Sequence, residues 1–236
     1  MELKNINSLV ELFFRQSKKN TPKKFSMNEP AFLTDLKLKE NDLPELRQPI
    51  NYSWRVVDGQ VRILTTYLRK IISRGDRCML LSENRPEWLV SDLSIMNAGG
   101  VTVPLFTTYS DKDFEYIVKD CAPKVCIVSN EEQFGKIKNY LTKDIKVISI
   151  DSFDEELDFF HKIFNDWQNI IIDQNFKIQH CVNTNLKRED LACIIYTSGT
   201  TGNPKGVMLS HGGILSNCEG ALDILIPLFK NEKPVF

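Results

Sequence analysis

The sequence lacks several features that would narrow its function at once. Its longest apolar stretches, such as Ile224–Phe229, are far shorter than the ~20 residues that a membrane-spanning helix needs. It has no long block of like charge, since 30 Lys and Arg balance 31 Asp and Glu for a net charge of −1. The basic excess typical of nucleic-acid binders is missing, so we predict no nucleic-acid partner. The first residues also lack the apolar core and cleavage site of a signal peptide.

The six cysteines form no recognisable ligand pattern, because they include no CxxC pair and no histidine at zinc-ligand spacing. Cys78, Cys126 and Cys193 lie in apolar runs, where cysteine usually packs as a small buried side chain. We interpret all six as reduced thiols and expect a cytoplasmic protein. Peripheral contact with a membrane stays open, because the Lys-rich stretches at 18–24 and 136–146 can meet anionic lipid. Solvated surface is the simpler interpretation of both stretches.

The composition is that of a globular protein: 236 residues, 42% hydrophobic and 26% charged. Short apolar runs predict strands at 78–81, 101–104, 125–128, 146–150 and 192–196. Helical patterns separate them at 86–98, 110–120 and 131–141. This alternation is typical of βαβ units, so we predict an α/β fold with three layers, α/β/α, around a largely parallel sheet.

The N-terminal region gives weaker signals. Apolar spacing predicts a helix over residues 5–18, followed by a surface loop through residue 30. Ser53 is placed to cap a second helix whose apolar face runs from Val57 to Ile72. Residues 151–186 are polar and irregular, and we assign them no structure. Tyr109, Phe114 and Tyr116 surround a predicted helix start, and we interpret them as packing residues rather than a stacking platform.

The most informative segment is residues 196–206, which read Tyr-Thr-Ser-Gly-Thr-Thr-Gly-Asn-Pro-Lys-Gly. Glycines let backbone N–H groups approach an anion closely, and the hydroxyls add further donors. Lys205 adds a charge whose hydrogen bond to a phosphate is worth roughly 1.5–3 kcal/mol. The segment is no Walker A loop, because Gly206 and an apolar run follow the lysine. We therefore expect the loop to close a hairpin between two strands.

A glycine-rich turn without a ligand is the alternative interpretation of this segment. Eight fixed positions in the pattern SGTTGxPKG, each with about 5–7% usage, would occur by chance in such a chain with a probability on the order of 10⁻⁷. The pattern resembles the phosphate-binding signature of the adenylate-forming superfamily, which includes acyl-CoA synthetases, firefly-type luciferases and peptide-synthetase adenylation domains.

Further segments resemble the long-chain fatty-acid CoA ligase branch of that superfamily. They are Tyr-Ser-Trp at 52–54, Gly-Asp-Arg at 75–77, Leu-Ser-Glu-Asn-Arg-Pro-Glu-Trp at 81–88 and Asn-Ala-Gly-Gly-Val-Thr-Val-Pro-Leu at 97–105. The resemblance runs from about residue 50 to the end and is weakest between 151 and 186. It implies the N-terminal portion of the adenylate-forming enzyme fold.

The resemblance also implies a site. In the family, the loop binds the β- and γ-phosphates of ATP while a carboxylate attacks the α-phosphate, and the acyl group then passes to coenzyme A. The phosphate-binding residues implied here are Thr197, Ser198, Gly199, Thr200, Thr201, Gly202 and Lys205. Thr197 is also expected to reach Mg²⁺, which usually takes few protein ligands. No residue of this chain is predicted to be catalytic, and the coenzyme A site is expected outside it.

The chain departs from the family pattern in two ways. Residues 210–213 read Ser-His-Gly-Gly, where the family commonly has Thr-His, a bulkier residue and Asn. We interpret His211 as a helix-start residue with a structural hydrogen bond, with support of the nucleotide site as the alternative. The adenine, ribose and catalytic-lysine segments of the family are also missing. We therefore expect a fragment that does not form acyl-adenylate alone and that dissolves poorly through an exposed sheet edge.

The predicted organisation has three parts: an N-terminal helix and arm at 1–50, an α/β subdomain at 51–182, and, at 183–236, the strand, phosphate-binding loop and following helix of an AMP-binding domain that is truncated after them. The predicted function is that of the N-terminal fragment of an ATP-dependent long-chain fatty-acid CoA ligase. The alternatives are a non-catalytic relic or split half that binds a partner chain, and an adenylation domain that loads a carrier protein. Fatty acid and ATP are the expected substrates, whereas acyl length, acceptor and homo-oligomerisation stay open.

Overall fold

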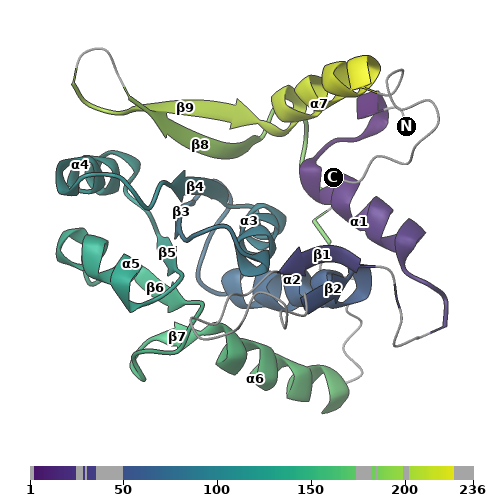
Figure 1. The fold of residues 1–236 in the computed structure, drawn as a ribbon, viewed down its shortest axis with the longest axis horizontal. Coiled ribbons are helices and arrows are strands. Elements are labelled where there is room, and N and C mark those ends of the chain that lie inside the picture. The colour runs from purple at the N-terminus through teal and green to yellow at the C-terminus, as the bar shows by residue number, and fades with distance from the viewer. Residues whose placement is uncertain are drawn as a thin grey trace, which may run out of the picture.

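A computed structural model of the chain describes residues 3–24, 29, 31–35, 50–173, 182–183, 185–198 and 202–225. Its centre is a seven-stranded sheet with the strand order β7-β6-β5-β3-β4-β8-β9 (Figure 1). The strands are β3 (Arg77–Leu81), β4 (Val101–Leu105), β5 (Val125–Val128), β6 (Lys146–Ser149), β7 (Asp158–Phe159), β8 (Leu191–Thr197) and β9 (Lys205–Ser210). All neighbours pair in parallel except β8 and β9, which are antiparallel. The predicted α/β fold with a largely parallel sheet is therefore confirmed.

Helices cover both faces of this sheet. The described helices are α1 (Leu9–Asn20), α2 (Trp54–Leu68), α3 (Pro86–Ala98), α4 (Asp111–Cys121), α5 (Glu131–Ile137), α6 (Phe160–Asp173) and α7 (His211–Leu225), with short 3₁₀ turns η1 (Leu3–Asn5) and η3 (Lys138–Tyr140). Local signals set several of these bounds. Ser53 caps α2 by accepting a hydrogen bond from the N–H of Val56, as predicted. Pro86 begins α3, and Gly99, with φ 93°, ends it in the left-handed conformation.

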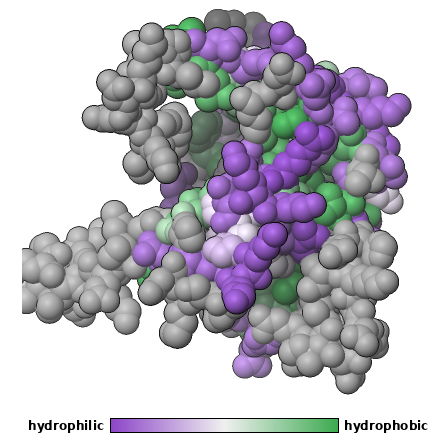
Figure 2. Space-filling model, turned by 90° about the vertical axis from the view of Figure 1, so that its right-hand side faces the viewer, coloured by the Kyte–Doolittle hydropathy of each residue, from purple (hydrophilic) through white to green (hydrophobic). Residues whose placement is uncertain are grey.

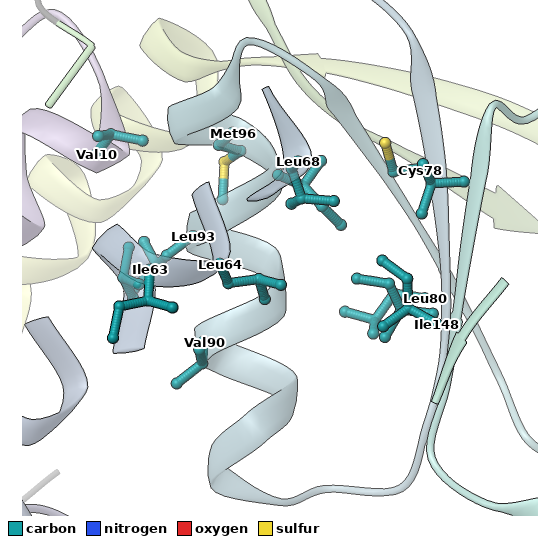
Figure 3. Packing of buried hydrophobic residues seen from close by; sticks show 14 of the residues in the cluster. Val10, Ile63, Leu64, Leu68, Cys78, Leu80, Val90, Leu93, Met96 and Ile148 are labelled. Atoms are coloured by element: carbon teal, nitrogen blue, oxygen red, sulfur yellow. The ribbon is translucent and has the colours of Figure 1, made fainter. Parts of the chain in front are cut away.

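The alternation of side chains along the inner strands divides the core into two layers. Cys78 and Leu80 of β3 face α1, α2, α3 and α6, whereas Met79 and Leu81 face α4 and α5. All four side chains are fully buried. Figure 3 shows part of the first layer, in which side chains from α1, α2 and α3 lie with those of β3 and β6. A strand with both faces buried must be apolar throughout, which explains the continuous apolar runs in the sequence.

The N-terminal region differs from its prediction. The helix predicted over 5–18 is α1, which begins at residue 9 because the Ser8 side chain accepts a hydrogen bond from the N–H of Glu11. It continues to Asn20, into the segment predicted as a loop. Strands β1 (Ala31–Asp35) and β2 (Ile50–Ser53) form a separate two-stranded antiparallel sheet, which the sequence patterns did not indicate. Their pairing crosses the boundary predicted at residue 50.

The segment from 151 onward, which had no predicted structure, contains β7 and α6. Phe160 and Ile163 anchor the start of α6 in the first core layer, each 3% exposed. The hydroxyl of Tyr67 donates a hydrogen bond of 2.5 Å to Asp158 of β7, which also pairs with Lys146. These contacts join α2 to the far edge of the sheet, opposite β9.

In the described part of the chain, no helix is both long enough and apolar enough to cross a bilayer. Seen from the right-hand side of Figure 1, the molecule presents mostly hydrophilic side chains, with hydrophobic ones between them (Figure 2).

The core predicts a clear contrast between two isoleucines. Ile127 of β5 is fully buried, whereas Ile224 of α7 is 71% exposed. Ile127→Ala should lower the free energy of unfolding by about 2–5 kcal/mol, because it removes buried methyl groups and leaves a cavity. The matched variant Ile224→Ala should change it by less than about 0.5 kcal/mol. Chemical denaturation measures both, and equal effects would contradict the described core.

Candidate functional site

The predicted phosphate-binding loop connects β8 to β9 at the edge of the sheet. The two strands form an antiparallel hairpin in which Thr197 pairs with Lys205 and Tyr196 pairs with Gly206. In Figure 1 this hairpin runs along the top of the molecule and ends above α4. The prediction that the loop closes a hairpin, rather than capping a helix, is confirmed. Because β8 runs parallel to β4, the loop lies at the carboxyl-terminal edge of the parallel strands, where α/β sheets commonly bind ligands.

The structure describes some of the predicted phosphate ligands, and the others lie outside the described residues. Thr197 ends β8, Ser198 follows it, and Lys205 begins β9, and all three side chains are exposed. Gly202 has φ 102°, a left-handed conformation that strains residues with a Cβ. Gly199, Thr200 and Thr201 lie outside the described residues. The role of the whole set as phosphate ligands stays a prediction.

Lys205 is the cation of this site. Within the described part of the chain, its ammonium group has no ion pair or hydrogen bond, unlike that of Lys119, which pairs with Glu115. It lies directly across the hairpin from Thr197. A hydroxyl donor and an unpaired positive charge thus share the loop end of the hairpin, which suits an anion better than a cation or a neutral ligand.

Tyr196 anchors the loop end of the hairpin to the rest of the domain. Its side chain is 2% exposed and packs on the α4 side of the sheet, where its hydroxyl donates a hydrogen bond of 2.5 Å to Asp120. Burial, followed by this hydrogen bond, raises the pKa of Tyr196, so the hydroxyl stays a donor at all physiological pH values. A Cβ on Gly206 would lie 2.9 Å from Ile194 Cγ2 and 3.3 Å from the Tyr196 ring. A side chain at position 206 would therefore force Ile194 or Tyr196 to shift.

Sequence reasoning missed part of this site. The ring of Tyr109 packs edge-to-face against Phe106 and Phe114, as the packing interpretation predicts. However, its hydroxyl also donates a hydrogen bond of 2.7 Å to the backbone carbonyl of Tyr196. No local pattern could indicate a contact across 87 positions. The contact of Gly206 with Tyr196 is equally invisible without the register of the hairpin.

The other end of the hairpin is tied to the N-terminal segment of the chain. His211, fully buried at the start of α7, accepts a hydrogen bond of 3.4 Å at Nδ1 from the N–H of Leu9. Arg188 donates to the carbonyls of Leu3 and Ile6 at 3.1 and 2.7 Å, and its backbone carbonyl accepts from Gly212. These contacts support the structural interpretation of His211 and fix the hairpin at its base.

The described residues hold no group of three or more His, Cys, Asp or Glu side chains that could bind a metal ion. A Mg²⁺ ion needs oxygen ligands and usually keeps several waters or phosphate oxygens. The exposed hydroxyl of Thr197 fits the share that such an ion takes from a protein when phosphates supply the rest.

The comparisons with known proteins identify the family of the chain. A family model described as AMP-binding enzyme matches residues 30–233. The chain belongs to the AMP-binding enzyme family.

Relatives of this AMP-binding chain are much longer than it is. Fatty acyl-CoA synthetase A of Dictyostelium discoideum is 34% identical over 158 residues, which cover 64% of this chain and 23% of that protein. Long-chain-fatty-acid–CoA ligase 5 of Rattus norvegicus is 32% identical over 163 residues, with 64% and 23% covered. The chain therefore spans about a quarter of the length of these curated relatives.

The fold is that of the adenylate-forming enzymes. The solved structure of the luciferase-like enzyme from the nonluminescent mealworm Zophobas morio superposes with a TM-score of 0.71 at 18% identity. The match covers 92% of this chain and 46% of that one, so the AMP-binding chain corresponds to about half of that structure.

Gly206 provides a test of the hairpin packing. Gly206→Ala should lower the free energy of unfolding by about 1–3 kcal/mol, because the added methyl group overlaps Ile194 and Tyr196. Gly220→Ala is the matched control: nothing lies within 4 Å of its added Cβ, and alanine favours the α7 helix by about 0.5–1 kcal/mol. Opposite signs are expected by denaturation, and a stabilising Gly206→Ala would contradict the register of β8 and β9.

His211 predicts a pH dependence of stability. Burial lowers the pKa of His211 from 6.5 to about 4, against a smaller opposing effect of Asp190. The unfolded chain binds this proton more readily, so stability is fully present above pH 6.5 and is lost as the pH falls toward 4. The loss from this group should be about 2–4 kcal/mol.

The measurement is the free energy of unfolding between pH 4 and 7 for the wild type, His211→Gln and His161→Gln. His211→Gln should flatten the curve, whereas His161→Gln, at an exposed position on α6, should leave its slope unchanged. An unaltered slope in His211→Gln would show that His211 is not buried in its neutral form.

Proposed function

We propose that this chain is the phosphate-binding part of an ATP-dependent fatty-acid CoA ligase, and that the β8–β9 hairpin holds the β- and γ-phosphates of ATP. The observation that carries the proposal is the pairing of Thr197 with Lys205, which sets a hydroxyl and an unpaired ammonium group side by side at the loop end. The names of two relatives, a fatty acyl-CoA synthetase and a long-chain-fatty-acid–CoA ligase, support the reaction class.

The proposed chemistry fits what this hairpin can supply. When a carboxylate attacks the α-phosphate of ATP, pyrophosphate leaves and negative charge accumulates on the β- and γ-phosphate oxygens. Lys205 and the backbone and hydroxyl donors around Thr197 and Ser198 would stabilise that charge and fix the direction of departure. Mg²⁺, when bound, would neutralise further phosphate charge, with the Thr197 hydroxyl as its protein contact. No described residue is assigned the attack itself, so the hairpin acts by binding and orientation.

Lys205 tests the proposal directly. Lys205→Ala should weaken MgATP binding to the 236-residue chain by about 10- to 100-fold, the worth of one charge-assisted hydrogen bond. Isothermal titration calorimetry measures the affinity. Lys143→Ala is the matched control, because Lys143 is an exposed lysine in the turn that precedes β6, at the opposite, amino-terminal edge of the sheet. It should bind MgATP like the wild type.

The same titration separates the proposal from its alternative. A relic loop would bind MgATP weakly and with the same affinity in the wild type and in Lys205→Ala. That result would end the assignment of the hairpin as a triphosphate site. Equal losses in Lys205→Ala and Lys143→Ala would instead show general charge attraction, which also contradicts a built site.

A further inference from the structure

We propose that Tyr109 is a positioning residue for the phosphate-binding hairpin, because its hydroxyl holds the backbone carbonyl of Tyr196, the residue directly before Thr197. This inference rests on the proposed function of the hairpin. In this arrangement the loop between β4 and α4, which carries Tyr109, fixes the position at which β8 ends and the anion-binding loop begins.

The need for such a support follows from the pairing of β8. In the ladder between β4 and β8, the paired residues are Thr102 and Cys193, three positions before Tyr196. On its other side, β8 continues to pair with β9 as far as Thr197. Among the described residues, the last two of β8, Tyr196 and Thr197, are thus ladder-paired with β9 and not with β4. The Tyr109 hydroxyl donates a hydrogen bond of 2.7 Å to this stretch of β8, at the backbone carbonyl of Tyr196.

Tyr109 is itself held firmly. Its ring lies edge-to-face against the fully buried ring of Phe114, with 5.9 Å between centroids and 82° between planes. Immediately after it, Ser110 and Asp113 form a reciprocal capping box at the start of α4. Two residues before it, the carbonyl of Thr107 accepts a hydrogen bond of 3.1 Å from Lys136 of α5. The donor is therefore preorganised before any ligand arrives.

The same helix holds Tyr196 at a second point. Asp120, in the last turn of α4, accepts the hydrogen bond from the Tyr196 hydroxyl. One residue of the hairpin is thus fixed at its carbonyl by Tyr109, just before α4, and at its side chain by Asp120, near the end of α4. Two attachments to one rigid helix define both the position and the direction of the backbone that enters Thr197. Displacements of about 1 Å are enough to weaken oriented phosphate contacts strongly.

Tyr109→Phe tests the hydroxyl alone, because the packed ring remains. Binding of MgATP, and of Mg-tripolyphosphate as a probe without adenosine, should weaken about 3- to 10-fold in the 236-residue variant. Amide hydrogen exchange should become faster in the peptide covering residues 197–206. The matched control is Tyr67→Phe, which removes a tyrosine–aspartate hydrogen bond of 2.5 Å at the far edge of the sheet. It should leave both affinities and this exchange unchanged.

A pair of Asp120 variants tests the second attachment. Asp120→Asn retains a hydrogen-bond acceptor and should bind both probes within about twofold of the wild type. Asp120→Ala removes the acceptor and should weaken both probes as Tyr109→Phe does. A merely structural role would lower stability in Tyr109→Phe and Tyr67→Phe alike, with no selective loss of phosphate affinity.

The outcomes separate this inference from the function on which it rests. If Lys205→Ala loses affinity but Tyr109→Phe binds both probes like the wild type, the hairpin is a phosphate site and Tyr109 does not position it. Equal weakening in Tyr109→Phe and Tyr67→Phe overturns the inference in the same way. If the wild-type chain binds neither probe, the proposed function fails and the inference falls with it.

Discussion

The parallel pairing of β8 with β4 is the constraint on which the candidate site depends. Thr102 and Cys193 are paired in this ladder although most of the α/β unit lies between them in sequence. The pairing brings the carboxyl end of β8 next to the loop that follows β4. Without it, the hairpin would carry the same residues, but its loop end would not lie beside the β4–α4 loop. The topology of the sheet therefore determines that the loop lies at the carboxyl-terminal edge, and the residues of the loop determine which ligand it can bind there.

The hairpin has an exposed outer side. Strand β9 pairs with β8 alone among the described residues, and its Val207 and Met208 side chains are 44% and 66% exposed. An edge strand with exposed apolar side chains is a site where other chains can pair. The support of β9 within the sheet therefore comes from β8, through the antiparallel ladder that ends at the Thr197–Lys205 pair. A methyl group at position 206 would disturb this one supporting strand, because it would overlap Ile194 and Tyr196 of β8.

The elements that sequence patterns predicted are those fixed by local chemistry. Ser53, Pro86 and Gly99 each set a helix boundary through their own conformation or hydrogen bonding, and the structure places those boundaries as predicted. The buried strands β3 and β5 are equally local, because a short apolar run between turns suits a strand with both faces covered.

The elements that sequence patterns missed depend on distant partners. Strand β1 exists through its pairing with β2, which begins fifteen positions beyond its end, and neither has a strong pattern of its own. Helix α6 is anchored by Phe160 and Ile163 against a core assembled from other elements. At the site, the sequence predicted the location of the loop and its hairpin. The contacts of Tyr109 and Asp120 with Tyr196 could not be predicted, since they span 87 and 76 positions.

These contacts change how the signature at residues 196–206 is understood. Lys205 is the residue whose chemistry points to a ligand, because it is charged, exposed and unpaired in the described part of the chain. Gly202 meets a backbone requirement, Gly206 a packing requirement, and Tyr196 an attachment to α4. Much of the signature thus specifies the hairpin rather than the phosphate. A chain that kept such residues while losing Lys205 would keep the shape of the loop without its charge, so the motif alone is a stronger predictor of this hairpin than of ATP binding.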